Sequence, residues 1–182
     1  MIVFSDCTLV VLGIGSNLGE RRRIALDAVT ALGRVLAELR AASLYETEPL
    51  YVTEQGRFIN TAVSGLYSGT PQELLFCIHE IEGRFGRDRD REQRWGERTL
   101  DIDILLFGEL NAALPALGNE AALLEIPHPR LKERRFALEP LLELLPDAVE
   151  PGTGLSYRSI CQALPCQGVR RLTALSTGAG SS

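Results

Sequence analysis

The sequence contains one lysine, Lys132, among its 182 residues, and it lacks three patterns that would each narrow its function. No Gly-x-x-x-x-Gly-Lys-Ser/Thr phosphate loop is present, so a nucleotide phosphate would have to be bound by arginines and metal ions. The four cysteines show no Cys-x-x-Cys spacing, which predicts free thiols in a reducing compartment. No apolar run reaches membrane-spanning length and no basic leader region precedes the first apolar residues, so we expect a cytoplasmic protein without a membrane partner.

The chain also lacks a net positive charge and has few aromatic residues. The formal net charge is -5 and aromatic residues make up 6% of the chain, which weighs against a nucleic-acid partner. The hydrophobic content of 45% is that of an ordinary globular protein. We expect a monomer with one domain over residues 1–165, followed by a flexible tail over residues 166–182, whose last seven residues are small and polar.

The most informative stretch that is present carries two aspartates. From Leu100 to Phe107 the residues alternate with the two-residue period of a half-buried strand. Asp101 and Asp103 therefore share one face, and two residues of strand rise place them roughly 6 to 7 Å apart. Such a pair can bind hard cations through oxygen and leave coordination positions for a phosphate-bearing substrate. The alternative is an ordinary exposed strand face.

Arginines gather directly before this strand. Arginine binds phosphate with two parallel hydrogen bonds, so an arginine-rich loop beside a carboxylate pair predicts a nucleoside triphosphate site. Acidic residues are interspersed with these arginines, and a solvated charged loop is the alternative. The arginines are Arg84, Arg87, Arg89, Arg91, Arg94 and Arg98.

Two further motifs concern the rest of the site. The glycines of Gly13-Ile-Gly15-Ser-Asn-Leu-Gly19 resemble a dinucleotide fingerprint, but the last spacing is one residue too long, and a tight strand-to-helix turn explains them better. Asn60 lies inside an expected strand, where its amide would suit the lactam edge of a heterocycle, although a strand-end asparagine with satisfied hydrogen bonds is equally compatible.

The order of the expected elements is strand, helix, strand, strand, helix, strand, then helix. This order predicts an α+β, ferredoxin-like βαββαβ sandwich with an antiparallel sheet, helices packed on it and an extra C-terminal helical segment. We expect Thr70 to begin the second helix with a capping box and Gly108–Asn119 to be a loop. The strands are expected at residues 9–14, 43–47, 58–67 and 100–107, and the helices at 25–39, 71–85 and 131–145.

Four stretches between about Val10 and Pro146 match a known family. They are Gly13-Ile-Gly-Ser-Asn-Leu18, Phe58-Ile-Asn-Thr-Ala-Val63, Arg94-Trp-Gly-Glu-Arg-Thr-Leu-Asp-Ile-Asp-Ile-Leu105 and Pro127-His-Pro-Arg130. The chain resembles the 6-hydroxymethyl-7,8-dihydropterin pyrophosphokinases. The resemblance implies transfer of pyrophosphate from ATP to the hydroxymethyl group of the pterin, in folate biosynthesis, with release of AMP and with two Mg²⁺ ions.

The resemblance also implies residue roles. Asp101 and Asp103 would bind the metal ions, and Arg87 and Arg98 would act with them on the transferring phosphates. The residues expected at ATP are Glu82, Arg89, Arg94, Trp95, Arg98, Ile104, His128 and Arg134. The residues expected at the pterin are Thr47, Pro49, Leu50, Phe58, Asn60 and Phe136. Two other interpretations remain: a ferredoxin-like RNA-binding module, and a relative that binds nucleotide without catalysis.

Overall fold

The computed structural model describes residues 7–49, 56–87, 98–116 and 119–173. Within these ranges the strands are β1 (Thr8–Ser16), β2 (Ala37–Ala41), β3 (Leu44–Thr47), β4 (Phe58–Tyr67), β5 (Asp101–Phe107), β6 (Ala112–Ala116), β7 (Asn119–Ile126) and β8 (Arg170–Thr173). The helices are α1 (Arg21–Leu32), α2 (Pro71–Arg84), α3 (Arg135–Leu144) and α4 (Tyr157–Ala163), and a single 3₁₀ turn, η1 (Leu131–Glu133), precedes α3.

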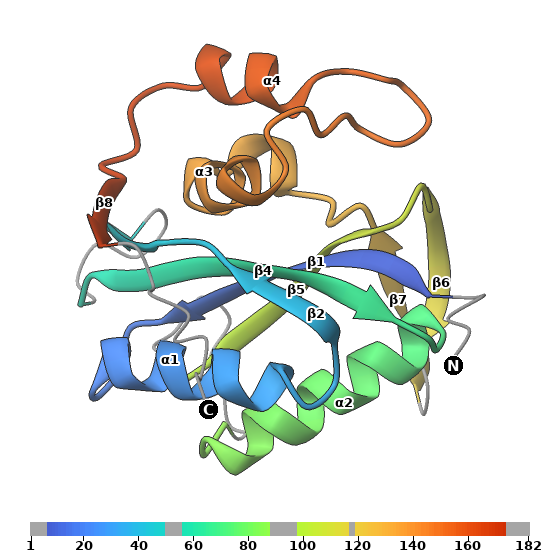
Figure 1. Ribbon diagram of the computed structural model, residues 1–182, viewed down its shortest axis with the longest axis horizontal. Helices are drawn as coiled ribbons and strands as arrows, with labels where there is room; N and C mark the ends of the chain where they lie inside the picture. Colours follow the sequence, from blue (N-terminus) through green and yellow to red (C-terminus); the bar gives the residue numbers. More distant parts are fainter. Residues whose placement is uncertain (1–6, 50–55, 88–97, 117–118, 174–182) are drawn as a thin grey trace, which may run out of the picture.

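Six of the described strands form one antiparallel sheet. Its order is β5-β1-β4-β3-β8, with β2 also paired to β4, while β6 and β7 form a separate hairpin. Helices α1 and α2 cover one face of the sheet, and α3 and α4 lie over the other (Figure 1). The predicted α+β fold with an antiparallel sheet is confirmed, and α3 and α4 form the extra helical segment.

Strand β1, between β5 and β4, contributes side chains to the core on both faces of the sheet. Leu12 and Ile14 pack with the side chains of α1 and α2, whereas Val11 packs with Leu138 and other residues of α3. On the α3 side the next two positions of β1 are Gly13 and Gly15, which carry no side chain. These two positions form a glycine strip between β4 and β5 that has no side chain from β1, although the Leu105 side chain of β5 lies over Gly13.

The register of the sheet sets what borders this strip. Gly15 pairs with Asn60 on β4 and with Asp101 on β5, and Gly13 pairs with Asp103 on β5. Residues that pair directly across a sheet project to the same face. Asn60 and the two aspartates thus border the glycine strip from opposite sides.

Helix α2 begins as its sequence predicts. The Thr70 side chain accepts a hydrogen bond from the Glu73 backbone N–H, and the Glu73 carboxylate accepts one from the Thr70 N–H, which completes the capping box. The helix ends at Arg84, and Gly86 then adopts a positive φ of 80°, which glycine accommodates without strain. The last turn of the helix places Glu82 at the start of β5.

Two expected elements are wrong. The first helix ends at Leu32 and not at residue 39, because Gly33 ends the helix and β2 begins at Ala37. The expected loop over Gly108–Asn119 contains β6, which pairs with β7.

The C-terminal segment contributes a strand. β8 lies in the part of the chain that the sequence assigned to a flexible tail, and it pairs with β3. The expectation for residues 176–182 lies outside the described residues. None of the helices in the described part of the chain is both long and apolar enough to span a membrane.

Candidate active site

Asp101 is paired with two arginines on the α3 face of the sheet. Arg87 Nη1 donates to its Oδ1 and Arg98 Nη1 donates to its Oδ2, both at 2.6 Å. Burial alone would raise the pKa of this carboxyl, but the guanidinium groups of Arg98 and Arg87 outweigh burial and hold the pKa below its usual range. Asp101 is therefore an anion that two arginines neutralise.

Glu82 fastens helix α2 to the start of β5. Its side chain is 1% exposed, and Oε1 accepts a 2.8 Å hydrogen bond from the backbone N–H of Ile102 and another from Arg87. Arg87, which is 5% exposed, therefore bridges Glu82 and Asp101. The three side chains form a buried chain of alternating charge between α2 and β5.

Asp103 has weaker partners than Asp101. Among the described residues, Arg134 Nη1 lies 3.7 Å and His128 Nε2 3.8 Å from its Oδ2. Burial and the neighbouring Asp101 charge raise the pKa of the Asp103 carboxyl above its ordinary value. A bound cation would favour its ionised form, as expected of a metal ligand.

His128 presents a neutral imidazole to Asp103. Burial and the Arg134 charge lower the pKa of His128 to about 4. The backbone N–H of Arg130 donates to Nδ1 at 3.1 Å, so the single ring proton of the neutral form lies on Nε2, the atom nearest Asp103. His128 can therefore donate one hydrogen bond to an anionic ligand without adding a charge.

Arg98 is held by a residue that the sequence did not single out. Asn17, 5% exposed, accepts a 2.6 Å hydrogen bond from the Arg98 backbone N–H and donates its own backbone N–H to the Arg98 carbonyl at 3.1 Å. Its sequence signals are its position after the glycine-containing strand and its place in the matching stretch Gly13–Leu18, neither of which assigned it a role. These two hydrogen bonds join the residue after β1 to the segment that precedes β5.

On the other side of the glycine strip from the aspartates lies the side-chain amide of Asn60. Asn60 is 4% exposed, and its Nδ2 donates to Thr47 Oγ1 at 2.8 Å. Phe58 pairs with Thr47 in the same register, two positions before Asn60. An amide beside an aromatic ring is an arrangement that can bind the edge of a flat heterocycle.

Helix α3 carries the other aromatic residue. Phe136 lies near its start, with the Arg134 guanidinium carbon 5.6 Å from the ring centroid. This contact places a cation and an aromatic ring side by side, close to Asp103. The start of α3 thus lies near the aspartate side of the glycine strip.

Most of the site residues predicted from the sequence and described in the structure gather around the strip. Pro49 is described at the end of the loop segment after β3, whereas Ile104 lies in the core with α1 and α2, on the face opposite the aspartates. The remaining predicted residues, Leu50, Arg89, Arg94 and Trp95, lie outside the described residues.

The metal assignment rests on the two aspartates. Among the described residues no group of three or more His, Cys, Asp and Glu side chains could hold a metal ion. Two carboxylates with one raised pKa are nevertheless a fitting donor set for a hard cation that takes its other ligands from water and phosphate.

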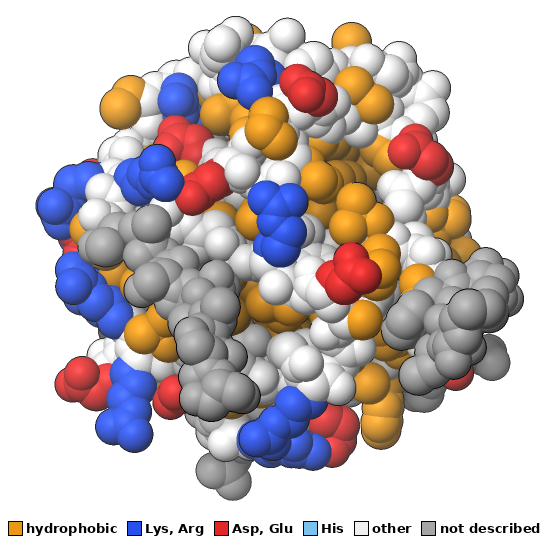
Figure 2. Space-filling view, in the orientation of Figure 1, with side chains coloured by type: hydrophobic (Ala, Val, Ile, Leu, Met, Phe, Trp, Pro, Cys, Tyr) orange, Lys and Arg blue, Asp and Glu red, His pale blue; other side chains and the backbone are white. Residues whose placement is uncertain are grey.

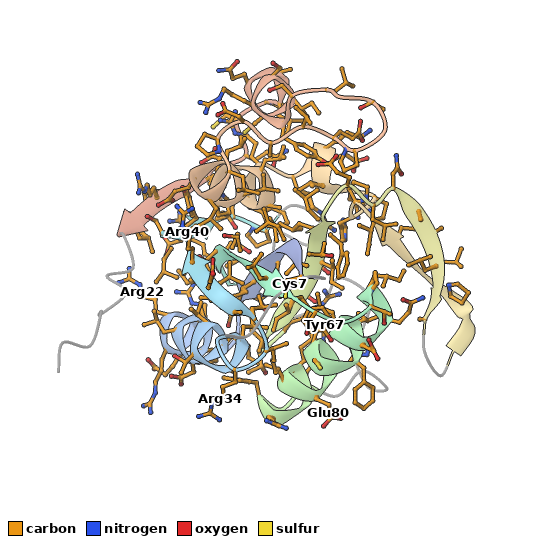
Figure 3. All side chains as sticks on the ribbon, turned by 45° about the vertical axis from the view of Figure 1, so that its right-hand side comes forward. Cys7, Arg22, Arg34, Arg40, Tyr67 and Glu80 are labelled. Atoms are coloured by element: carbon orange, nitrogen blue, oxygen red, sulfur yellow. The ribbon has the colours of Figure 1, made fainter. Side chains whose placement is uncertain are left out.

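Surface charges on the opposite helices take no part in this cluster. Arg22, Arg34 and Glu80 point away from the body of the protein (Figure 3). The fold and the clustered arginines and carboxylates define an α+β protein whose sheet carries a site suited to phosphoryl chemistry.

Comparison with known proteins gives the particular family. A family model described as 7,8-dihydro-6-hydroxymethylpterin-pyrophosphokinase (HPPK) matches residues 11–146. The chain is 39% identical over 166 residues to the 2-amino-4-hydroxy-6-hydroxymethyldihydropteridine pyrophosphokinase of Pseudomonas aeruginosa, covering 90% of this chain and 96% of that protein. The chain belongs to the 7,8-dihydro-6-hydroxymethylpterin-pyrophosphokinase family.

Some relatives are much longer. The chain is 39% identical over 152 residues to the mitochondrial folate synthesis bifunctional protein of Arabidopsis thaliana, covering 83% of this chain and 26% of that one. It spans between 20% and 28% of the length of three such folate-synthesis proteins.

Solved structures show the same fold. A crystal structure of HPPK-DHPS in complex with substrates superposes with a TM-score of 0.73 at 13% identity, covering 92% of this chain and 47% of that one. Wild-type HPPK-DHPS of Plasmodium falciparum with SDX-DHP gives a TM-score of 0.67 at 15% identity, covering 86% and 44%. At these identities the likeness concerns the fold alone.

Proposed function

We propose that the protein transfers the β,γ-pyrophosphoryl group of ATP to the hydroxymethyl oxygen of 6-hydroxymethyl-7,8-dihydropterin. The observation that carries the proposal is the pairing of Gly15 with both Asn60 and Asp101. This pairing places two groups on one face of the sheet. One is an amide that can hydrogen-bond to a heterocycle, and the other is a carboxylate–arginine cluster that can bind polyphosphate. The names of the bacterial relatives support the same reaction.

The absence of a side chain at Gly15 provides the room for this arrangement. Neighbouring strands lie about 4.8 Å apart, so β4 and β5 are separated by roughly 10 Å across β1. A pterin bound at Asn60, with Phe58 and Phe136 available for stacking, would direct its hydroxymethyl group across Gly15 toward the aspartates. Proximity of this kind supplies much of the rate enhancement of a two-substrate reaction.

The bond changes are those of a direct displacement. The hydroxymethyl oxygen bonds to the β-phosphorus, the bond from that phosphorus to the α,β-bridging oxygen breaks, and AMP leaves with the bridging oxygen. The hydroxymethyl proton passes to solvent. Arg87, Arg98 and Arg134 provide positive charge for the phosphate oxygens, and His128 offers its neutral Nε2–H.

The proposed reaction also requires Mg²⁺. Asp101 and Asp103 would hold it, and the raised pKa of Asp103 supports this assignment because a neighbouring cation would relieve the repulsion between the two carboxylates. When bound, Mg²⁺ would withdraw charge from the phosphate oxygens and orient the triphosphate.

An RNA-binding role is less well supported. Two carboxylates lie on the sheet face that RNA would approach, and on the face shown in Figure 2 the Lys and Arg side chains are interleaved with Asp and Glu. A binding site that follows an RNA backbone needs a continuous basic groove.

The test is an incubation of purified protein with ATP, Mg²⁺ and 6-hydroxymethyl-7,8-dihydropterin, with the nucleotide products separated by ion-exchange chromatography. We expect AMP to form in step with pterin consumption and to be absent when the pterin is omitted. Formation of ADP would overturn the proposal in favour of an ordinary kinase or hydrolase. ATP binding without turnover would identify a relative that has lost catalysis.

A further inference from the structure

Arg134 lies at the junction between η1 and α3, and its backbone conformation there sets the direction of its side chain. It separates η1 from α3 and has an extended backbone, with φ -119° and ψ 97°. Its side chain is 12% exposed, with Nη1 3.7 Å from Asp103, and its Nε is buried with no hydrogen-bond partner among the described residues. The guanidinium therefore has hydrogen-bonding capacity left for a ligand, provided the junction holds it in place.

The junction is held by a side chain from the C-terminal segment. Gln167 Oε1 accepts a 2.9 Å hydrogen bond from the backbone N–H of Arg135, and Gln167 Nε2 donates to the Glu133 carbonyl at 2.8 Å. One amide thus binds the peptide groups on both sides of Arg134. It also serves as the cap for α3, since the first N–H groups of a helix have no partner within it and Arg134 supplies no side-chain cap.

Gln167 is itself fixed by its neighbours. Arg135 Nη1 donates to the carbonyl of Leu164 at 3.2 Å, and Gly168 then turns the chain with a φ of 63° into β8. The segment runs from α4 past α3 to the sheet edge at β3 (Figure 1). The sheet pairing of β8 therefore anchors the amide that binds the junction.

We propose that Gln167 is a positioning residue for the nucleotide: by binding the backbone on both sides of Arg134, it aims the guanidinium at the phosphates beside Asp103. This inference rests on the proposed function for the identity of the nucleotide. It assigns no contact between Gln167 and substrate. It predicts that loss of Gln167 weakens ATP binding through Arg134 more than pterin binding, because Asn60, Thr47 and Phe58 lie on other elements and only Phe136 belongs to α3.

The first experiment compares Gln167→Ala with Gln162→Ala, an exposed glutamine on α4 that serves as the matched control. The KM values for ATP and for the pterin are measured, together with the Kd of the α,β-methylene analogue of ATP in the presence of Mg²⁺. Loss of two backbone hydrogen bonds should raise the KM for ATP and the analogue Kd by about tenfold in Gln167→Ala. The KM for the pterin should rise less than the KM for ATP in Gln167→Ala, since Phe136 is the one proposed pterin contact on α3, and all constants of Gln162→Ala should stay within twofold of wild type.

A double variant separates positioning from a general structural role. If Gln167 acts through Arg134, adding Gln167→Ala to Arg134→Ala should not weaken analogue binding further. Additive losses, an equal loss for ATP and pterin, or wild-type constants in Gln167→Ala would each overturn the inference. Gln167→Glu keeps the acceptor for the Arg135 N–H but cannot donate to Glu133, so it should fall between wild type and Gln167→Ala.

The two proposals can fail separately. Binding of the analogue requires no turnover, so a wild-type protein that binds it but makes no AMP would overturn the proposed function alone. A wild-type protein that makes AMP, together with a Gln167→Ala variant that binds the analogue normally, would overturn this inference alone. Thermal unfolding of each variant shows whether the protein is folded at the assay temperature.

Discussion

Asp101 and Asp103 lie two residues apart on β5, yet their surroundings shift their pKa values in opposite directions. Burial acts on both carboxyls, but Arg98 and Arg87 lower the pKa of Asp101, whereas the Asp101 charge adds to burial in raising the pKa of Asp103. Neighbouring carboxylates with opposite shifts are typical of functional sites. At the scale of the residue, this pair is the centre of the proposed chemistry.

Asp101→Asn and Asp103→Asn should each lower kcat by about 100-fold or more. This is the loss in kcat that is typical when one contact to the transition state is removed. Asparagine keeps the side-chain volume but removes the anionic ligand, so circular dichroism should be unchanged. Turnover is measured at saturating Mg²⁺, with Asp27→Asn as the control, because Asp27 is an exposed carboxylate paired to Arg23 on α1. Near-normal turnover of both site variants would contradict the metal assignment.

Gly15, in the glycine strip, gives a second prediction at the scale of the residue. A Cβ on Gly15 would lie 3.1 Å from Asn60 Oδ1, so Gly15→Ala should displace the amide that faces the pterin. We expect the KM for the pterin to rise by about tenfold, equivalent to about 1.4 kcal/mol of binding free energy. Gly83→Ala is the control, since its Cβ would meet nothing within 4 Å. An unchanged pterin KM in Gly15→Ala would show that the strip does not hold the pterin.

The sequence was sufficient to predict the position of residues that follow a regular local spacing. The alternation after Leu100 places Asp101 and Asp103 on one face, and the structure confirms this. Asn17 was missed because its partner, Arg98, lies 81 residues away. A hydrogen bond between distant segments leaves no periodic signal in either of them, and the same is true of Gln167 and the junction at Arg134.

At the scale of the element, helix α3 is tied to the sheet by one carboxylate. Glu143 accepts hydrogen bonds from the Ser43 N–H at 3.1 Å and from Ser43 Oγ, Tyr45 Oη and Arg171 Nη2, each at 2.8 Å. These donors come from the segment around β3 and from β8. Burial would raise the pKa of Glu143, but the hydrogen bonds from Tyr45 and Ser43, together with the Arg171 charge, hold it below its ordinary value.

Glu143→Gln should lower the free energy of unfolding at pH 7 by about 2 kcal/mol, because hydrogen bonds to a charged group are replaced by weaker ones. The native pKa lies below the unfolded value of 4.5, so the stabilisation by this carboxylate is present above pH 4.5 and is lost as the pH falls through the native pKa. Urea unfolding at several pH values should therefore show the gap to wild type closing in acid.

The control for this series is Glu80→Gln, an exposed carboxylate on α2. It should unfold like wild type at every pH. A gap between Glu143→Gln and wild type that is absent at pH 7, or that stays constant into acid, would contradict the role given to Glu143.

Element boundaries show where periodicity misleads. Val35, Leu36 and Leu39 continue the helical spacing of α1, yet Gly33 ends the helix and Leu39 belongs to β2. Their apolar character follows from packing against the same core, which both a helix and a following strand can do. β6 was missed because it is a short strand that pairs outside the main sheet.

At the scale of the whole molecule, the C-terminal segment links the sheet edge at β3 to helix α3. β8 covers the edge of β3, and the same segment supplies Gln167 to α3 and Arg171 to Glu143. An uncovered strand edge exposes unpaired backbone groups. Sequence patterns do not predict this role, since β8 is short and carries two arginines.

A chain ending after Pro165 should unfold at a lower urea concentration than wild type and bind the α,β-methylene analogue of ATP more weakly. It loses the β8 pairing with β3 and the Gln167 contacts to α3. The matched control ends after Thr173 and retains both. Equal urea midpoints for the two chains would show that β8 does not stabilise the sheet.

The central claim is transfer of an intact pyrophosphoryl group to the pterin, and ³¹P NMR of the completed reaction tests it most directly. The reaction contains the wild-type protein, ATP, Mg²⁺ and 6-hydroxymethyl-7,8-dihydropterin. Attack at the β-phosphorus predicts one phosphate signal from AMP and two mutually coupled signals from a pterin diphosphate. Signals of ADP with a pterin monophosphate would place the attack at the γ-phosphorus and contradict the account.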